Sequence, residues 1–236
     1  MKKNAIFTTI ILALFFVTAD LFPQQKGDKK EVLGSTIKII KEVKYIPAGT
    51  NKEILQKQPG KALYAEDKVE TGKNSISLVK FLDGTILTVQ ENSLLRIFGK
   101  VNKQANAKGI KANTVVDHGS AYFKVEKQKS NSEFKFTTPT MVASIRGTEG
   151  YIKVDNDTVS SLALVEGTVT IESVGGKKET GTVTAGKFAT VNSNGEFHLY
   201  EEIPPDLKKE MKSAQTTDIK KLRISTDNGD IIIKYK

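Results

Sequence analysis

SISLVKFLDGTILTV, residues 75–89, decides the fold class. Both halves of this stretch are rich in β-branched and large apolar residues, and Asp83-Gly84 separates them. Because Asp and Gly both tolerate the positive φ angles of a tight hairpin turn, the stretch predicts two antiparallel strands joined by a short turn. The segments around this hairpin extend the same pattern.

Short β-prone runs separated by Gly, Pro, Asn and Asp continue on both sides of the hairpin. Upstream, residues 36–45 carry Ile37, Ile39, Val43 and Tyr45 on one parity, which predicts a strand with one face in water. The polar stretch 99–113, rich in Lys and Asn, is expected to form an exposed loop. Residues 138–154 are expected to form two strands joined by a glycine-marked turn. Further strands are expected at 94–98, 121–126, 133–137, 158–165, 168–172, 182–191 and 231–235.

One segment near the C-terminus has helical spacing. Two prolines and Asp206 precede a run in which Leu207, Met211 and Ala214 share one side, at i, i+4 and i+7. The sequence therefore predicts an all-β fold of short stacked or solenoid-like strands with one short C-terminal helix. A two-sheet sandwich is the alternative, since both arrangements bury one parity of each strand.

The N-terminus has the pattern of a secretory signal peptide. Two lysines precede the uncharged run 5–17, and Val17-Thr18-Ala19 offers small residues at a cleavage site. An uncleaved anchor is the less favoured alternative, because a bilayer span needs about 20 apolar residues. We expect a signal peptide at 1–19, a flexible leader at 20–34, a β domain at 35–200 and a helix and strand appendage at 201–236. The expected location is the periplasm, the cell surface or the medium.

Composition excludes several classes of site. The chain has no cysteine, so it can form neither disulfides nor thiolate metal centres. Its formal net charge of +9 is spread along the sequence rather than gathered in blocks. Such a surface is typical of a soluble protein and is drawn weakly to polyanions and anionic membrane surfaces.

No motif of a catalytic, cofactor or metal site is evident. His118 and His198 are the two histidines, and neither belongs to a metal-binding motif. The acidic turns at 155–157 and 227–230 lack the full spacing of a calcium loop, and Asx-turns explain both. We therefore expect no enzyme activity, no cofactor and no metal. Nucleic-acid binding is not expected either, because no basic stripe alternates with aromatic residues.

Three segments together resemble the FecR domain of bacterial extracytoplasmic regulators. Residues 60–97 carry the Asp83-Gly84-Thr85 turn, residues 117–154 carry Arg146-Gly147-Thr148, and residues 162–191 carry Glu166-Gly167 followed by Gly186. Each motif is weak alone, but their order in an all-β chain is specific. The resemblance extends over roughly residues 55 to 195 and makes these nine residues family-motif positions that are either structural or partner-binding.

The resemblance implies a β-rich extracytoplasmic sensory module. In the best-known members, a cytoplasmic segment before the membrane helix controls a sigma factor; here four residues precede the apolar run, so direct sigma-factor control is not expected. For Arg146, a structural pair with Glu166 between strands is favoured over ligand binding, because a guanidinium suits a carboxylate. Gly147 is expected to need a positive φ angle or a close approach.

The expected function is that of a non-enzymatic sensing or adaptor module outside the cytoplasm. Its partner would be an envelope protein or a polymer such as lipopolysaccharide or the cell wall. The alternative is a structural, polyanion-binding protein of the envelope, and an envelope hydrolase ranks third. The hydrolase would require a deep cleft lined with carboxylates.

Overall fold

The computed structural model describes residues 30–104, 107–127, 132–216, 221–226 and 229–234. The chain divides into the units Met1–Lys30 and Glu31–Lys236. The expected signal peptide and residues 20–29 of the expected leader lie outside the described residues. No helix of the described part has both the length and the apolar character needed to cross a membrane.

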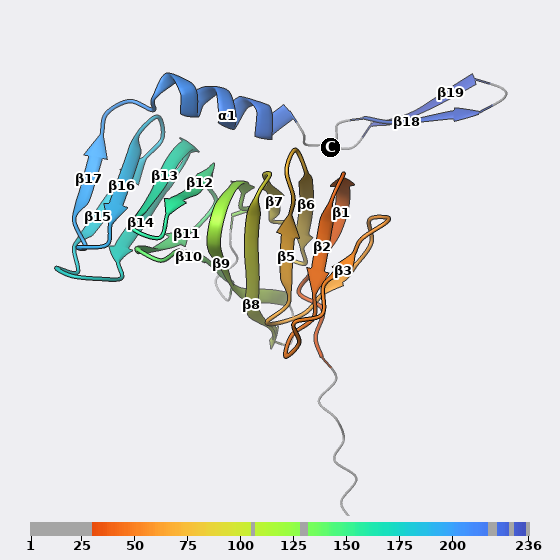
Figure 1. Ribbon diagram of the computed structural model, residues 1–236, viewed down its shortest axis with the longest axis horizontal. Helices are drawn as coiled ribbons and strands as arrows, with labels where there is room; N and C mark the ends of the chain where they lie inside the picture. Colours follow the sequence, from red (N-terminus) through yellow and green to blue (C-terminus); the bar gives the residue numbers. More distant parts are fainter. Residues whose placement is uncertain (1–29, 105–106, 128–131, 217–220, 227–228, 235–236) are drawn as a thin grey trace, which may run out of the picture. The chain divides into compact units, whose positions relative to one another are not determined.

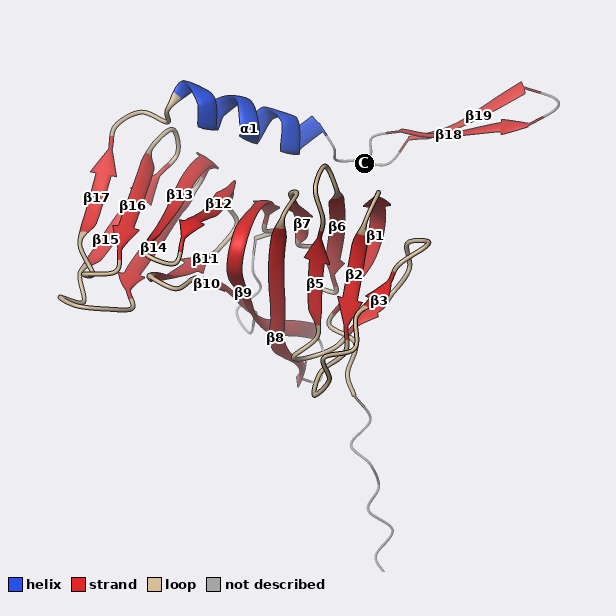
Figure 2. Cartoon of the chain, in the orientation of Figure 1, coloured by secondary structure: helices blue, strands red, loops and turns tan. Residues whose placement is uncertain are grey.

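The described residues are mainly β-strands, as Figures 1 and 2 show. The helix is α1 (Pro205–Thr216). The strands are β1 (Gly34–Ile40), β2 (Val43–Ile46), β3 (Ile54–Leu55), β4 (Ala62–Leu63), β5 (Lys68–Thr71), β6 (Ile76–Phe81), β7 (Ile86–Val89), β8 (Ser93–Gln104), β9 (Ala107–Lys124), β10 (Glu133–Thr137), β11 (Met141–Ile145), β12 (Glu149–Asn156), β13 (Val159–Glu166), β14 (Thr168–Ser173), β15 (Thr180–Thr184), β16 (Phe188–Asn192), β17 (Phe197–Tyr200), β18 (Lys221–Thr226) and β19 (Gly229–Lys234).

Two sheets, which share β9, form the body of the protein. Sheet A has the strand order β4-β1-β6-β7-β9-β12-β13-β16-β17. Sheet B has the order β3-β2-β5-β8-β9-β10-β11-β14-β15. Residues 107–118 of β9 pair with β8 in sheet B, and residues 119–124 pair with β12 in sheet A. β18 and β19 form a separate hairpin.

The main hydrophobic core lies between the two sheets. Phe81 and Phe123 of sheet A meet Phe134 and Phe136 of sheet B, with ring centroids 5.2 and 5.0 Å apart in the Phe81–Phe134 and Phe123–Phe136 pairs. All four rings are buried. The all-β prediction with a short C-terminal helix is confirmed: the strands stack side by side, largely in chain order, and the layers are those of the two-sheet alternative.

A second, smaller core lies on the outer face of sheet A. There Leu207, Met211 and Ala214 of α1 are buried against a patch formed with Tyr122 and Tyr151 of the sheet. The predicted apolar side of the helix is therefore the side that packs. Sheet A is covered on both faces over these strands, by sheet B inside and by α1 outside.

The prediction of an exposed loop at 99–113 is wrong. These residues belong to the long hairpin of β8 and β9, in which Val101 lies opposite Ile110. Ile110 and Ala112 are buried in the core. Lys100 and Lys111 pair across the hairpin and are exposed. The polar composition reflects the outer face of a strand pair, not a loop.

The N-terminal expectations also need correction. Leu33 is fully buried, so the expected flexible leader does not extend to residue 34. Residues 36–45 form two strands rather than one, β1 in sheet A and β2 in sheet B, with Lys41 between them at φ 57°. A register shift in β1 between Thr36 and Lys38 breaks the alternation, which leaves Ile37 exposed.

Candidate functional site

The first family-motif turn joins β6 to β7, as the Asp83-Gly84 signal predicts. The Thr85 N–H donates to Asp83 Oδ1 at 2.9 Å, and the Phe81 N–H donates to the Thr85 carbonyl at 2.9 Å. Gly84 has φ 94°. A Cβ added there would lie 3.2 Å from Glu126 Cγ, so this turn adjoins the segment that follows β9.

The second motif turn, between β11 and β12, packs against the same segment. Gly147 has φ 63°, and a Cβ on it would come within 2.9 Å of Lys127 Cγ. The Val125 N–H donates to the Thr148 carbonyl at 2.9 Å. Gly147 thus meets both expected requirements, a positive φ angle and a close approach. Arg146 beside it is exposed.

The third and fourth motif turns continue the series. Gly167, between β13 and β14, has φ 91°, and a Cβ there would lie 2.4 Å from Thr148 Cγ2. Its carbonyl accepts from the Ala185 N–H at 3.0 Å. Gly186, between β15 and β16, has φ 83° and donates its N–H to the Leu164 carbonyl at 2.8 Å. The second, third and fourth turns therefore touch one another in succession, and the first and second turns both pack against the segment after β9.

Together these turns form one row, which we name the motif edge. Strand register places it at one end of sheet A, because Lys124 lies opposite both Ile86 and Glu149, and Glu149 lies opposite Glu166. The structure thus brings together the nine predicted family-motif residues from four separate turns. Sequence reasoning missed the β9 end, which has no motif of its own. The motif edge comprises residues 82–85, 124–127, 146–149, 165–167 and 185–187.

Two apolar side chains project into solvent at the motif edge. Leu82 is 59% exposed in the first turn, and Val165 is 46% exposed at the end of β13. Val165 is the extra residue of a β-bulge, since Glu149 pairs with Glu166 whereas Gly150 pairs with Leu164. A bulge re-aims side chains and often marks a functional edge. The exposure of Val165 is therefore built into the pairing of β12 with β13.

The expected pair of Arg146 and Glu166 is not formed. Both side chains are exposed, and no ion pair between them occurs in the described part of the chain. The register places Glu166 opposite Glu149 instead. Glu149 is engaged elsewhere: it accepts hydrogen bonds from the Tyr122 hydroxyl and from Gln215 Nε2 of α1, and Lys124 Nζ lies 3.6 Å away.

In the described part of the chain, Arg96 forms a bidentate arginine–carboxylate pair. Its Nε and one terminal nitrogen donate to Asp117 at 2.7 and 2.6 Å, on the outer face of sheet B. The hydrogen bond to Asp117 raises the pKa of Arg96 above its ordinary value. An open groove of about 310 Å³ lies beside this pair, and its lining includes one carboxylate, Glu66. A single carboxylate does not supply the acid–base pair of a glycoside hydrolase.

The described residues include no metal-ligating cluster, and the motif edge is distinguished by its exposed side chains. No group of three or more His, Asp or Glu side chains among them is arranged to hold a metal ion. His118 and His198 are exposed on β9 and β17, with β12, β13 and β16 between those strands in sheet A. The motif edge instead offers an exposed Arg146, two exposed aliphatic side chains and charged residues of both signs.

Residues 67–170 match the model of the family described as FecR protein. This region of the chain is similar to a FecR domain. The match takes in the first three motif turns and ends before Gly186, and it is shorter than the expected span of 55 to 195. The resemblance inferred from Asp83-Gly84-Thr85, Arg146-Gly147-Thr148 and Glu166-Gly167 is thereby confirmed.

Two solved structures are distantly similar in fold. Both are crystal structures of a candidate anti-sigma factor from Parabacteroides distasonis, and each has a TM-score of 0.45. Their sequence identities to this chain are 12% and 11%, and in both cases the similarity covers 72% of this chain and 99% of the other. No curated protein matches the sequence.

Proposed function

We propose that this protein is a non-enzymatic sensing or adaptor module that works outside the cytoplasm and binds a protein partner or an envelope polymer. The similarity to a FecR domain supports a role as a signalling regulator. The signal-like N-terminus, with two lysines before the apolar run 5–17 and small residues at 17–19, supports the location.

The observation that carries the proposal is the continuity of the motif edge. Leu82, Arg146 and Val165 come from three separate turns but lie on neighbouring strand ends, in the order β7, β9, β12 and β13. Strands in a sheet lie about 4.8 Å apart, so the row from β7 to β13 is roughly 14 Å long. An extended segment of about four residues has this length. The row can therefore receive a peptide or a polymer chain.

Site-specific photo-cross-linking tests the proposal. A photoreactive phenylalanine analogue replaces Leu82 or Val165 in the exported protein, and the same analogue at Thr182, an exposed residue of β15, serves as the control. We expect a discrete cross-linked species from positions 82 and 165 and none from position 182. The additional substitution Arg146→Glu should reduce the yield several-fold, because it reverses the exposed charge of the row.

The nature of the cross-linked species decides between the two kinds of partner. A species destroyed by protease contains a protein, whereas one destroyed by a muramidase contains cell-wall polymer. Equal cross-linking at all three positions would refute binding at the motif edge. Retention on heparin that falls steeply with salt and does not depend on Arg146 would favour a structural, polyanion-binding role.

A further inference from the structure

Each sheet ends in unpaired strand edges, at opposite ends of its strand order. At the N-terminal side, sheet A ends in β4 and in the part of β1 after Ser35, which does not pair with β4. Sheet B ends on the same side in β3. β17 ends sheet A at the C-terminal side. An unpaired edge presents backbone groups that another strand can pair with. These two ends are distinct from the motif edge.

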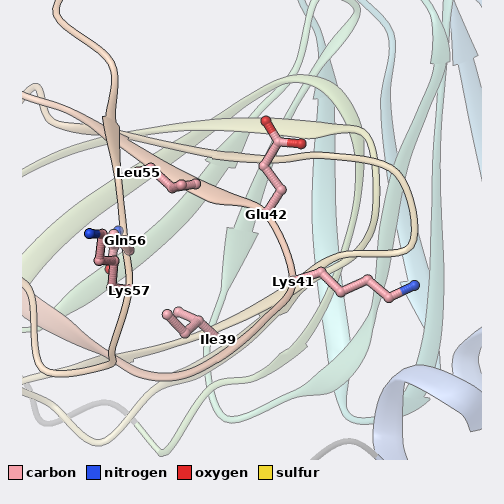
Figure 3. A pocket seen from close by; sticks show the side chains of 6 residues that line it. All are labelled: Ile39, Lys41, Glu42, Leu55, Gln56 and Lys57. Atoms are coloured by element: carbon pink, nitrogen blue, oxygen red, sulfur yellow. The ribbon is translucent and has the colours of Figure 1, made fainter.

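An open groove of about 610 Å³ lies at the N-terminal end, between the β1–β2 bend and β3. Figure 3 shows Leu55 and Ile39 on either side of it, with Gln56 beside them, while the Lys41 side chain extends away. Leu55 is 54% exposed although it is aliphatic. The groove is lined by Ile39, Lys41, Glu42, Leu55, Gln56 and Lys57.

Gln56 brings an unused hydrogen-bond donor to this groove. Its side chain is 7% exposed, and its Oε1 accepts a hydrogen bond from Thr36 Oγ1 at 3.1 Å. Its Nε2 has no hydrogen-bond partner among the described residues. A buried amide without a partner is destabilising by about 1–3 kcal/mol. This nitrogen is closed to solvent, so an acceptor in the groove would relieve the loss once the Gln56 side chain turns to expose it.

The backbone of β3 is also open on this side. The Gln56 N–H donates to the Val43 carbonyl of β2 at 2.8 Å. Backbone groups of an antiparallel strand point alternately to the two sides, so the N–H and C=O of Leu55 point away from β2. The groove therefore offers a strand edge, an amide donor and an aliphatic surface to an extended segment.

The C-terminal end presents a segment that fits these features. The Asn192 N–H donates to the Glu196 carbonyl, and the Phe197 N–H donates to Glu179 Oε2 at 2.9 Å. By the same alternation, the N–H and C=O of Leu199 point away from β16. Leu199 is 40% exposed and Tyr200 next to it is 47% exposed. Glu201 and Glu202 follow directly.

The charges at the two ends are complementary. Lys41 and Lys57 have no ion-pair partner in the described part of the chain, and the nearby Glu42 and Glu53 lie within ion-pair distance of Lys44. At the other end, Glu202 is exposed and unpaired among the described residues. The remaining charged groups there are Glu201, held by Lys187 at 2.8 Å, Glu196 near Lys177 at 4.0 Å, Glu179, Lys178 and His198.

We propose that the groove between β1 and β3 binds the β17 edge of a second copy of this chain, so that the molecules associate head to tail. Leu199 of one copy covers Leu55 of the next, and Glu202 lies near Lys57. The Gln56 side chain turns towards the groove, so that its Nε2 donates to a backbone carbonyl of the bound segment. The two surfaces differ, so the contact is heterologous, and assemblies larger than a dimer form as concentration rises.

Analytical ultracentrifugation of the exported protein over a range of concentrations tests this proposal. We expect a mass that grows past the dimer as concentration rises. Leu55→Lys blocks the groove and Leu199→Lys blocks the edge, so each variant alone should stay monomeric with an unchanged circular dichroism spectrum. Mixed together, they should form a one-to-one dimer and nothing larger, because one intact groove meets one intact edge.

Three further measurements separate this contact from others. Lys208→Glu, on the exposed side of α1, should leave association unchanged. A labelled peptide of residues 196–203, EFHLYEEI, should bind the wild type and not the Leu55→Lys variant. Gln56→Leu should weaken association about tenfold, because it removes the amide donor. A wild type that is monomeric at all concentrations, or a dimer that both Leu55→Lys and Leu199→Lys leave intact, would overturn the proposal.

Discussion

Gly167 and Gly186 both adopt positive φ angles at the motif edge, but their surroundings differ. A Cβ on Gly167 would lie 2.4 Å from Thr148 Cγ2, whereas a Cβ on Gly186 would meet nothing within 4 Å. Gly186→Ala should therefore lower the free energy of unfolding by about 1–2 kcal/mol through backbone strain alone. Gly167→Ala should lower it by about 3 kcal/mol, since overpacking adds to the strain.

Urea denaturation of the two variants side by side measures this difference, provided that the dependence on denaturant concentration stays the same. The pair separates backbone strain from steric crowding, because both glycines close turns of the same edge. Equal losses in the two variants would show that Thr148 moves aside without loss of stability.

Two buried tyrosines predict how stability responds to alkaline pH. Burial raises the pKa of Tyr151 above its ordinary value of 10.0, and nearby Glu210 raises it further. Burial and the hydrogen bond to Asp67 raise the pKa of Tyr45 in the same way. The folded state thus holds these protons more tightly than the unfolded state, so stability is fully present below pH 10 and falls as pH rises above it.

Denaturation at a series of pH values checks this prediction. Tyr151→Phe should reduce the loss of stability above pH 10, because the variant lacks one of the two buried hydroxyl groups whose pKa is raised by folding. Ser120→Ala is the matched control: it removes the oxygen that accepts from the Tyr151 hydroxyl at 2.7 Å but leaves the buried hydroxyl in place, so the loss should persist. A loss that is identical in the wild type and in Tyr151→Phe would contradict the assignment.

Individual residues also show where sequence reasoning succeeds at the site and where it fails. The turns at Gly84 and Gly147 were predictable, because an Asp-Gly pair and an isolated glycine between strands require special backbone angles. The Arg146–Glu166 pair was not, because pairing depends on register. One extra residue, Val165, shifts that register and places Glu166 opposite Glu149. No local sequence pattern predicts such a bulge.

At the scale of elements, α1 holds the second core in place. Met211 is 5% exposed and packs with Tyr122 and Tyr151 on the outer face of sheet A. Met211→Ala should lower the free energy of unfolding by about 2 kcal/mol, because it removes buried apolar surface and leaves a cavity. Lys212→Ala, one position along on the exposed side of the helix, should change it by less than about 0.5 kcal/mol.

Thermal denaturation followed by circular dichroism compares these two variants. A Met211→Ala variant as stable as Lys212→Ala would mean that α1 contributes little to the fold. Binding of a hydrophobic dye to Met211→Ala alone would indicate that the helix has left the sheet and exposed the patch that it covers.

The elements also differ in how well the sequence predicts them. The β6–β7 hairpin and α1 follow local rules of turn chemistry and helical spacing. The β8–β9 hairpin was not predicted, because lysines and asparagines on one face obscure its alternation. Small residues such as Ala112 occupy the other face. A strand that supports the core with small side chains looks like a loop when composition alone is considered.

At the scale of the whole molecule, the choice between a solenoid and a sandwich could not come from the sequence. Both bury alternate residues, and the information that separates them lies in which strands pair. The pairing of β9 distinguishes the two arrangements, because residues 107–118 pair in sheet B and residues 119–124 pair in sheet A. This switch gives the protein two layers around one continuous core.

The shared strand predicts how the molecule unfolds. In a stack of repeats each unit contacts its neighbours only, so cooperativity can break down along the stack. Here β9 ties both sheets together, and unfolding should be a single transition. Leu63→Ala, at the β4 end of sheet A, and Val183→Ala, at the β15 end of sheet B, both delete fully buried side chains. Each should move the whole transition to lower denaturant concentration.

Circular dichroism and tyrosine fluorescence, recorded on the same urea titrations, distinguish the two behaviours. The tyrosines lie on both sides of β9, with Tyr45 in β2 and Tyr151 in β12, so the two signals diverge if either half unfolds by itself. Coincident curves in both variants are expected. Separate transitions, with Leu63→Ala shifting only the first and Val183→Ala only the second, would show that the two ends fold as independent units despite the strand that they share.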